Sequence, residues 1–159
     1  MVSEPDPVWL TPVAHRKLQE EYDQLTGEGR RHIEERIAEA RSHGDIRENA
    51  DYDAAKNEQG LMEARIRKLR HILDTAEVHE ASDSGVVEVG SLVTVRDDSG
   101  EMEFLVADPE NKVAGILLAS PSGPLGRALL GAAVGDTVSY EAPAGTFSYD
   151  VVNVRPFEG

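Results

Sequence analysis

The chain has 159 residues, no cysteine and a formal net charge of −14, which comes from 16 basic and 30 acidic side chains. The length allows one ordinary domain or two small ones, the charge argues against sequence-independent coating of nucleic acid, and the absence of cysteine excludes disulfides and thiolate metal sites. The N-terminal sequence MVSEPDPVWL lacks the features of a signal peptide, and no apolar run approaches the roughly 20 residues that span a bilayer, so we expect a cytoplasmic protein without a membrane partner.

The first helical segment is predicted to begin at Thr11 and Pro12, a pair typical of an N-cap and the first helical position. Apolar side chains then recur at helical spacing, at Leu18, Tyr22, Leu25, Ile33, Ile37 and Ala40. The sequence TGEG at 26–29 interrupts them, and each glycine costs about 1 kcal/mol relative to alanine in a helix. We therefore expect the helix to weaken or kink at 26–29.

The next stretch, RSHGDIRENADYDAAK at 41–56, contains four closely spaced carboxylates, on Asp45, Glu48, Asp51 and Asp53. A purely structural explanation exists: Gly44 ends one helix, Asp45 caps the next with Glu48 as its capping-box partner, and the helix dipole favours further acids in the first turn. Capping does not require four acids, however, and each like-charged neighbour at helical spacing costs a few tenths of a kcal/mol. A functional role beside the structural one stays open.

The second helical segment alternates three and four residues between the positions of one seam: Tyr52, Ala55, Gln59, Met62, Ile66, Leu69, Leu73 and Ala76. This pattern is typical of a coiled coil, and the short link to the first helix favours an antiparallel hairpin. A helix of about 30 residues extends roughly 45 Å. The acidic turn is therefore expected at the far end of a rod, as a tip that spans 44–53.

From about residue 85 the pattern changes to short β-branched or aromatic runs that are separated by turn sequences. The runs are SLVTV, EMEFLVA, VAGILLA, DTVSYEA and TFSYDVVNV, and one helical segment, GPLGRALLG, lies among them at 123–131. The predicted fold class is α+β: an antiparallel coiled-coil hairpin followed by a small antiparallel β-sheet domain with one helix. We place the two domains at 8–80 and 85–159.

Exposed carboxylates at the end of a rod limit the chemistry that the tip can support. Their hard oxygen atoms suit Mg²⁺, but this ion keeps most of its water and is rarely held by one or two acids alone. Asp45 and Glu48 would bind it weakly, unless a partner's active site supplied the other ligands, as in two-metal phosphoryl transfer. Glycoside hydrolysis needs a walled cleft, and the chain has no H-E-x-x-H, G-x-S-x-G or phosphate-loop motif.

Two stretches resemble a known family. GDIRENADYDAAKNEQGLMEARIRKL is similar to the tip and second helix of the Gre transcription elongation factors, the bacterial transcript-cleavage factors of the GreA type. SPSGPLGRALLGAAVGD, at 120–136, is similar to their C-terminal domain, which has an FKBP-like fold and docks on the polymerase. The resemblance extends from about Trp9 to Arg155. It implies an accessory factor that is not itself an enzyme.

The resemblance also implies a partner and a site. The coiled coil would enter the secondary channel of bacterial RNA polymerase, where Asp45 and Glu48 would help to hold the second Mg²⁺ of the polymerase active centre. This Mg²⁺ is shared and is not stably bound by the free protein, which is expected to be a monomer. The polymerase would then cleave backtracked RNA. Asn49 and Tyr52 would shape the tip, and Lys56 and Arg65 are candidates for contact with the RNA 3′ end or the channel wall. The alternative for both basic residues is a solvated outer face.

One residue departs from the family pattern. Asp53 stands where GreA-type proteins commonly have histidine after the tyrosine. The added acid makes the tip more negative, and family members with altered acidic tips inhibit the polymerase. Inhibition without cleavage is therefore the alternative function, and a coiled-coil chaperone unrelated to the polymerase is a third.

Four aromatic residues of the second half allow two interpretations. The FKBP-like resemblance would make them the lining of a prolyl-isomerase pocket, whereas their strand spacing indicates packing in the core. We expect core packing for all four, which are Phe104, Tyr140, Phe147 and Tyr149.

Overall fold

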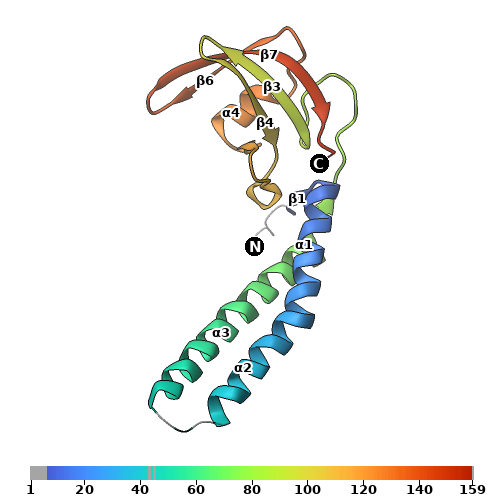
Figure 1. Ribbon diagram of the computed structural model, residues 1–159. Coiled ribbons are helices and arrows are strands. Elements are labelled where there is room, and N and C mark those ends of the chain that lie inside the picture. Colours follow the sequence, from blue (N-terminus) through green and yellow to red (C-terminus); the bar gives the residue numbers. More distant parts are fainter. Residues whose placement is uncertain (1–6, 43, 45, 159) are drawn as a thin grey trace, which may run out of the picture. The chain divides into compact units, whose positions relative to one another are not determined.

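The computed structural model describes residues 7–42, 44 and 46–158, and for 46–48 it describes the backbone alone. Its contacts divide the chain into two compact units, shown in Figure 1. The hairpin unit is Arg16–Thr75, and the sheet unit joins the residues up to His15 with those from Ala76 onward. Within the described residues, no helix is long and apolar enough to cross a membrane.

Two antiparallel helical arms form the hairpin (Figure 1). The elements are α1 (Pro12–Gln24), the π-helical turn η1 (Leu25–Gly29), α2 (Arg30–Ser42) and α3 (Ile46–Thr75). The hydroxyl oxygen of Thr11 accepts a hydrogen bond of 3.1 Å from the backbone N–H of Ala14, which confirms the predicted N-cap. The predicted weak point at 26–29 falls within η1, where the wider π-helical turn interrupts the α-helix.

The predicted seam packs the arms of the hairpin together. Ala55, Ile66 and Leu69 are buried, and the other seam positions are half-buried. Ile33 and Ile37 of α2 pack against Ala55. Among the residues that the structure describes, three ion pairs between the arms flank this apolar contact: Arg30–Glu63, Arg36–Glu58 and Arg65–Glu21. The coiled-coil hairpin is confirmed.

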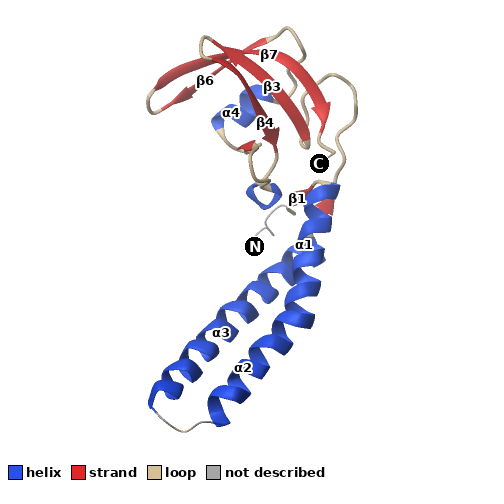
Figure 2. Cartoon of the chain, in the orientation of Figure 1, coloured by secondary structure: helices blue, strands red, loops and turns tan. Residues whose placement is uncertain are grey.

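The sheet unit contains a five-stranded sheet with α4 on one face, as Figure 2 shows. Its elements are β3 (Ser91–Asp97), β4 (Gly100–Val106), β5 (Leu117–Ala119), α4 (Pro124–Leu129), β6 (Thr137–Ala142) and β7 (Gly145–Pro156). The strands lie in the order β5-β4-β3-β7-β6. Each of the predicted runs contains a strand, and the predicted helix is α4.

The sheet is mixed, whereas the sequence analysis expected an antiparallel one. β5 runs parallel to β4, and the remaining neighbours are antiparallel. A parallel neighbour requires a crossover connection, and the segment 107–116, which includes the 3-10 turn η2 (Pro109–Asn111), provides it. Side chains alternate between the two faces in parallel and antiparallel strands alike. The sequence of the run at 113–119 therefore did not indicate that its strand is parallel to its neighbour.

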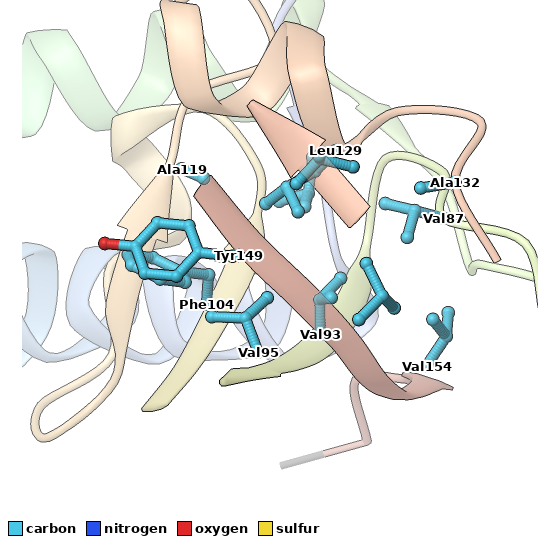
Figure 3. Close-up of a cluster of buried hydrophobic side chains, with 12 residues drawn as sticks. Val87, Val93, Val95, Phe104, Ala119, Leu129, Ala132, Tyr149 and Val154 are labelled. Atoms are coloured by element: carbon cyan, nitrogen blue, oxygen red, sulfur yellow. The ribbon is translucent and has the colours of Figure 1, made fainter. Parts of the chain in front are cut away.

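Buried apolar side chains lie on both faces of this sheet. On the face that α4 covers, the core includes Val93, Val95, Phe104, Leu129 and Tyr149 (Figure 3). On the opposite face, a smaller cluster of buried residues joins the first turn of α1 to the sheet: Val13, Leu92, Leu105, Ala107 and Phe157. The first residues of the chain therefore complete the packing of its second half.

Hydrogen bonds also tie the N-terminal segment to the sheet unit. β1 (Trp9–Leu10) pairs in parallel with β2 (Glu77–Val78), at the two chain positions that flank the hairpin. The buried side chain of Asn111 accepts a bond of 2.8 Å from the backbone N–H of Thr11 and donates one of 2.8 Å to the backbone oxygen of Trp9. The boundaries 8–80 and 85–159 stay a prediction about domains, while the contacts group the residues up to His15 with the second half.

Candidate functional site

The acidic turn connects α2 to α3 at the end of the hairpin (Figure 1). Between these helices, Gly44 has a φ of 148°, a positive value that favours glycine, and this supports the predicted helix stop. Asp45 lies outside the described residues. Glu48 belongs to the first turn of α3, but its side chain is also outside the description. The predicted metal pair Asp45 and Glu48 therefore stays a prediction.

A contact between Arg41 and Tyr52 joins the two helices next to this turn. The Nη2 of Arg41 lies 3.3 Å from the hydroxyl oxygen of Tyr52 and donates a hydrogen bond to it. The guanidinium carbon lies 5.5 Å from the centre of the Tyr52 ring, within the range of a cation–π contact. The hydrogen bond and the charge of Arg41 lower the pKa of Tyr52. The last turn of α2 is thereby fastened to the second turn of α3.

The ring of Tyr52 also rests on a small apolar cluster. Ile33, Ile37 and Ala55 are buried there, and Tyr52 and Met62 pack against them. Tyr52 thus contacts Arg41 on one side and the interior of the hairpin on the other. Such a doubly held ring gives the first turns of α3 a fixed base, while the tip-shaping role of Tyr52 stays a prediction. That analysis missed Arg41, because a single basic residue before a helix end is too common to be a signal.

The other predicted residues of the tip are exposed. Asn49, Asp51 and Asp53 all have exposed side chains on the first two turns of α3. Asp53 follows Glu48 by five residues, which places it about 140° around the helix axis. The backbone of α3 therefore does not direct Asp53 and Glu48 to a common point. Asp53 is therefore an acid with a solvent-exposed side chain.

The two basic candidates for RNA contact, Lys56 and Arg65, differ in the contacts that they make. Lys56 is exposed, and its Nζ donates a hydrogen bond of 3.0 Å to the side-chain oxygen of Gln59. Arg65 instead forms two hydrogen bonds, of 2.7 and 2.8 Å, with the carboxylate of Glu21. These bonds lower the pKa of Glu21. Because the guanidinium of Arg65 is engaged within the hairpin, Lys56 is the better placed of the two to contact a ligand.

The donor chemistry of the tip fits a shared Mg²⁺ and does not fit a complete site. Carboxylate oxygens are the ligands that Mg²⁺ prefers, and two of them fill only part of its six positions. Among the described residues, no group of three or more acidic or histidine side chains could hold a metal ion. If Asp45 and Glu48 act on Mg²⁺, other ligands must come from elsewhere.

Comparisons with known proteins cover nearly the whole chain. The family model described as "Transcription elongation factor, N-terminal" matches residues 8–78, and that described as "Transcription elongation factor, GreA/GreB, C-term" matches residues 82–156. The chain is 44% identical over 156 residues to the transcription elongation factor GreA of Streptomyces coelicolor, with 95% of this chain and 94% of the relative covered.

A second GreA relative matches to a similar extent. Identity to the GreA of Saccharopolyspora erythraea is 45% over 163 residues, with 99% of this chain and 100% of the relative covered. Among solved structures, the GreA factor homolog 1 (Gfh1) protein of Thermus thermophilus is 28% identical, with 94% of this chain and 99% of that chain covered and a TM-score of 0.45.

Proposed function

Because the chain belongs to the GreA/GreB family of transcription elongation factors, we propose that it binds bacterial RNA polymerase at the secondary channel and stimulates the polymerase's own cleavage of backtracked RNA. The observation that supports this proposal is the coiled-coil hairpin, in which Arg41 of α2 contacts Tyr52 of α3 beside the acidic stretch that links the two helices. A narrow helical rod can enter a channel that a globular domain cannot. The protein would then act in the cytoplasm, where transcription takes place in bacteria.

The residues of the tip would have three different roles: metal binding, shaping of the turn and contact with RNA. Asp45 and Glu48 would offer carboxylate oxygens to a Mg²⁺ that the polymerase also holds. When bound, that ion supplies charge stabilisation and an activated water for an in-line phosphoryl displacement. Asn49 and Tyr52 would shape the turn that carries the acids. Lys56, one turn beyond Tyr52 on α3, would approach the negatively charged RNA 3′ end.

The decisive experiment measures the rate of RNA release from stalled, backtracked polymerase. Asp45→Asn should reduce the stimulated rate at least about 10- to 100-fold, since removing even an indirect partner of a metal ligand has that effect. Asparagine still caps a helix, so the substitution separates the metal role from the structural one. Asp51→Asn is the matched control, because it removes an equal charge six residues further along the chain and should leave the rate nearly unchanged.

Two results would contradict the proposal. If Asp45→Asn stimulates cleavage like the wild type, Asp45 does not act on the metal. If the wild type binds the polymerase and slows cleavage, the protein is an inhibitor of the secondary channel. Incubating labelled RNA with Mg²⁺ and the protein alone should give no cleavage, since two acids cannot organise the ion.

Docking on the polymerase is assigned to the sheet unit, on the basis of the segment 120–136. A chain in which a short linker replaces Arg16–Thr75 retains the residues up to His15 that complete the sheet unit. This shortened chain should compete with the full-length protein for polymerase. A folded competitor that fails to displace the full-length protein at any concentration counts against the assignment.

A further inference from the structure

Phe147 is an aromatic side chain at the surface of the sheet unit. It is 40% exposed, and its ring stacks on that of Tyr140 with centroids 5.6 Å apart. Phe147 lies where β6 and β7 stay paired beyond the end of β3. The expected core packing is therefore wrong for Phe147, whereas it is confirmed for Phe104 and Tyr149, which are both 8% exposed, and Tyr140 is half-buried against the core.

Trp9 is also exposed, at 38%, and it borders a hollow of about 540 Å³. This volume lies within the range of small-molecule sites, about 300–1,000 Å³. The hollow belongs to the sheet unit, and its lining includes Pro7, Trp9, Glu77, Asp108, Pro121 and Ser122. We call it the Trp9 hollow.

Contacts within the sheet unit hold Trp9 in place beside this hollow. Trp9 of β1 pairs with Glu77 of β2, and since side chains alternate between faces, partners in register stand on the same face. The backbone oxygen of Trp9 accepts the 2.8 Å bond from Asn111, and its ring meets that of His79 edge-on, with centroids 4.8 Å apart. The ring is thus fixed before a ligand arrives, which reduces the entropy lost on binding.

The charge of the Trp9 hollow is negative. Glu77 and Asp108 line it, and among the described residues no basic side chain does. Within the described part of the chain, neither carboxylate has a hydrogen-bond or ion-pair partner, and Asp108 precedes the turn η2 without capping it. The Nε2 of the neighbouring His79 is directed to Glu88, whose Oε1 lies 3.6 Å away. The hollow therefore combines an indole ring with two carboxylates that lack a cation.

We propose that the Trp9 hollow is a binding site for a guanidinium group on an aliphatic chain, the chemistry of an arginine side chain or of a free alkylguanidinium compound. A guanidinium group is planar and weakly hydrated, so it stacks on an aromatic face while its N–H groups reach neighbouring carboxylates. Tryptophan is the aromatic residue that attracts cations most strongly. Pro7 and Pro121 add apolar surface for the aliphatic chain.

Other ligands fit the hollow less well. Glu77 and Asp108 would repel a phosphate group, and an uncharged apolar ligand would remove water from both carboxylates without pairing them. A metal ion would find an incomplete site, because no described group of three or more acidic or histidine side chains could hold one. An ammonium group is more strongly hydrated than a guanidinium group and loses more on leaving water. The sequence MVSEPD, at 1–6, contains no basic side chain that could supply the cation.

Trp9 is the single tryptophan of the chain, so tryptophan fluorescence reports on this hollow alone. The test titrates the full-length protein with butylguanidinium, butylammonium and the uncharged isostere butylurea at constant ionic strength. Butylguanidinium should change the emission of Trp9 and shift its indole N–H signal in NMR spectra. Butylammonium should bind more weakly, and butylurea should bind most weakly of the three.

Substitutions at the lining test which groups hold the cation. Glu77→Gln and Asp108→Asn each remove one carboxylate and keep the size of the side chain. Each should weaken butylguanidinium binding about two- to fivefold, the range for an exposed charge pair. Trp9→Leu, measured by calorimetry because it removes the fluorophore, should weaken binding by a similar factor. Glu80→Gln is the matched control: it removes an equal charge at an exposed acid outside the lining and should leave binding unchanged.

Three results would overturn the proposal: equal binding of butylurea and butylguanidinium, an unshifted indole signal, or an equal loss in Glu80→Gln and in both lining variants. A capped peptide with one arginine, compared with its citrulline analogue, identifies the source of the cation. Tighter binding of the arginine peptide than of butylguanidinium assigns the site to a partner protein, and the reverse order assigns it to a free compound. The assay contains no polymerase, so its failure and that of the proposed function are distinguishable.

Discussion

Arg41 and Tyr52 are the residues through which the two helices meet beside the acidic turn, and their contact can be tested by titration. Arg41 lowers the pKa of Tyr52 below its ordinary value of 10.0 through a hydrogen bond to the hydroxyl oxygen and through its charge, both of which favour the phenolate. Arg41→Gln should therefore raise the pKa of Tyr52 toward the ordinary value. The measurement is a pH titration of the Tyr52 ring by NMR.

Arg36→Gln is the control for this titration. Arg36 also belongs to α2, but it pairs with Glu58 and not with Tyr52. Removing it changes the net charge equally and should leave Tyr52 almost unaffected. The same pKa of Tyr52 in the wild type and in Arg41→Gln would show that the contact does not persist in solution.

Asp53 is the residue at which the tip departs from the family pattern, and its exposure determines what we expect of it. A solvated acid that α3 directs away from Glu48 has little influence on a metal bound at Glu48. Asp53→His should change the stimulated rate of RNA cleavage only modestly, within several-fold. If the wild type suppressed cleavage and Asp53→His restored it, a charge on the side of the tip would determine whether the factor stimulates or inhibits.

The sequence predicted part of this site and missed another part. The glycine stop could be predicted because it belongs to one contiguous motif, while the roles of the acids and of Tyr52 in that motif stay predictions. Arg41 was missed because its partner lies on the other helix, and hairpin register is not visible in either helix alone. The ion pair between Arg65, a candidate for RNA contact, and Glu21 could not be predicted for the same reason, because Glu21 lies on the facing arm.

At the scale of elements, α4 depends on a glycine that packs against backbone. A Cβ atom built on Gly126 would lie 1.8 Å from the backbone oxygen of Ser120, so no side-chain rotation could relieve the contact. Gly126→Ala should lower the free energy of unfolding by about 1–3 kcal/mol or more, the usual cost of overpacking. Urea unfolding followed by circular dichroism measures the change.

Gly60 on α3 is the matched control, because a Cβ atom there meets nothing within 4 Å. Gly60→Ala should raise the free energy of unfolding by up to about 1 kcal/mol, through helix propensity alone. Opposite signs for the two substitutions are the expected outcome. A neutral Gly126→Ala would mean that the segment before α4 moves freely away.

The ion pair between Glu21 and Arg65 gives the hairpin a dependence on pH. Its hydrogen bonds lower the pKa of Glu21 below the ordinary value of 4.5. A lowered pKa means that the unfolded chain binds the proton more readily than the folded chain. The stabilisation is therefore complete above about pH 4.5 and is lost as the pH falls through the lower, folded pKa.

Thermal unfolding of the wild type and of Glu21→Gln at neutral and at acidic pH tests this dependence. At neutral pH, the wild type should be more stable than Glu21→Gln by about 0.2–1 kcal/mol, the range for exposed ion pairs. This difference between the two proteins should vanish in acid. Glu20→Gln, at an exposed neighbouring acid, is the control. A difference that persists below the folded pKa would assign the effect to packing of the side chain.

Most elements could be predicted because their periods are local properties of the sequence. The seam of α3 and the runs of β3, β4, β6 and β7 each repeat within a few residues. The direction of β5 and the pairing of β1 with β2 could not be predicted, because both depend on segments that lie far apart in the chain. The same reason explains why Phe147 was expected in the core: strand spacing gives the face of a residue but not where the supporting strand ends.

For the whole molecule, Asn111 is the residue that holds the start of the chain to its second half. It is 1% exposed, and it bonds to the backbone of both Thr11 and Trp9. Asn111→Ala would leave the buried N–H of Thr11 without its partner, at about 1–3 kcal/mol, and would also remove the bond to the partly buried backbone oxygen of Trp9. We expect a clear loss of unfolding free energy in urea. Asn153→Ala, at an exposed asparagine of β7, should have little effect, and a similar effect of both would contradict the bridging role.

The pairing of β1 with β2 also bears on how the chain reaches its folded state. In the unfolded chain, these strands are separated by the full length of the hairpin, and the entropy lost on closing such a loop grows with its length. The hairpin itself forms from contacts between residues nearer in sequence, and such contacts form faster. Once α1 lies against α3, the two ends of the loop are already held near each other. We therefore expect the formation of the helical hairpin to determine the rate at which β1 pairs with β2.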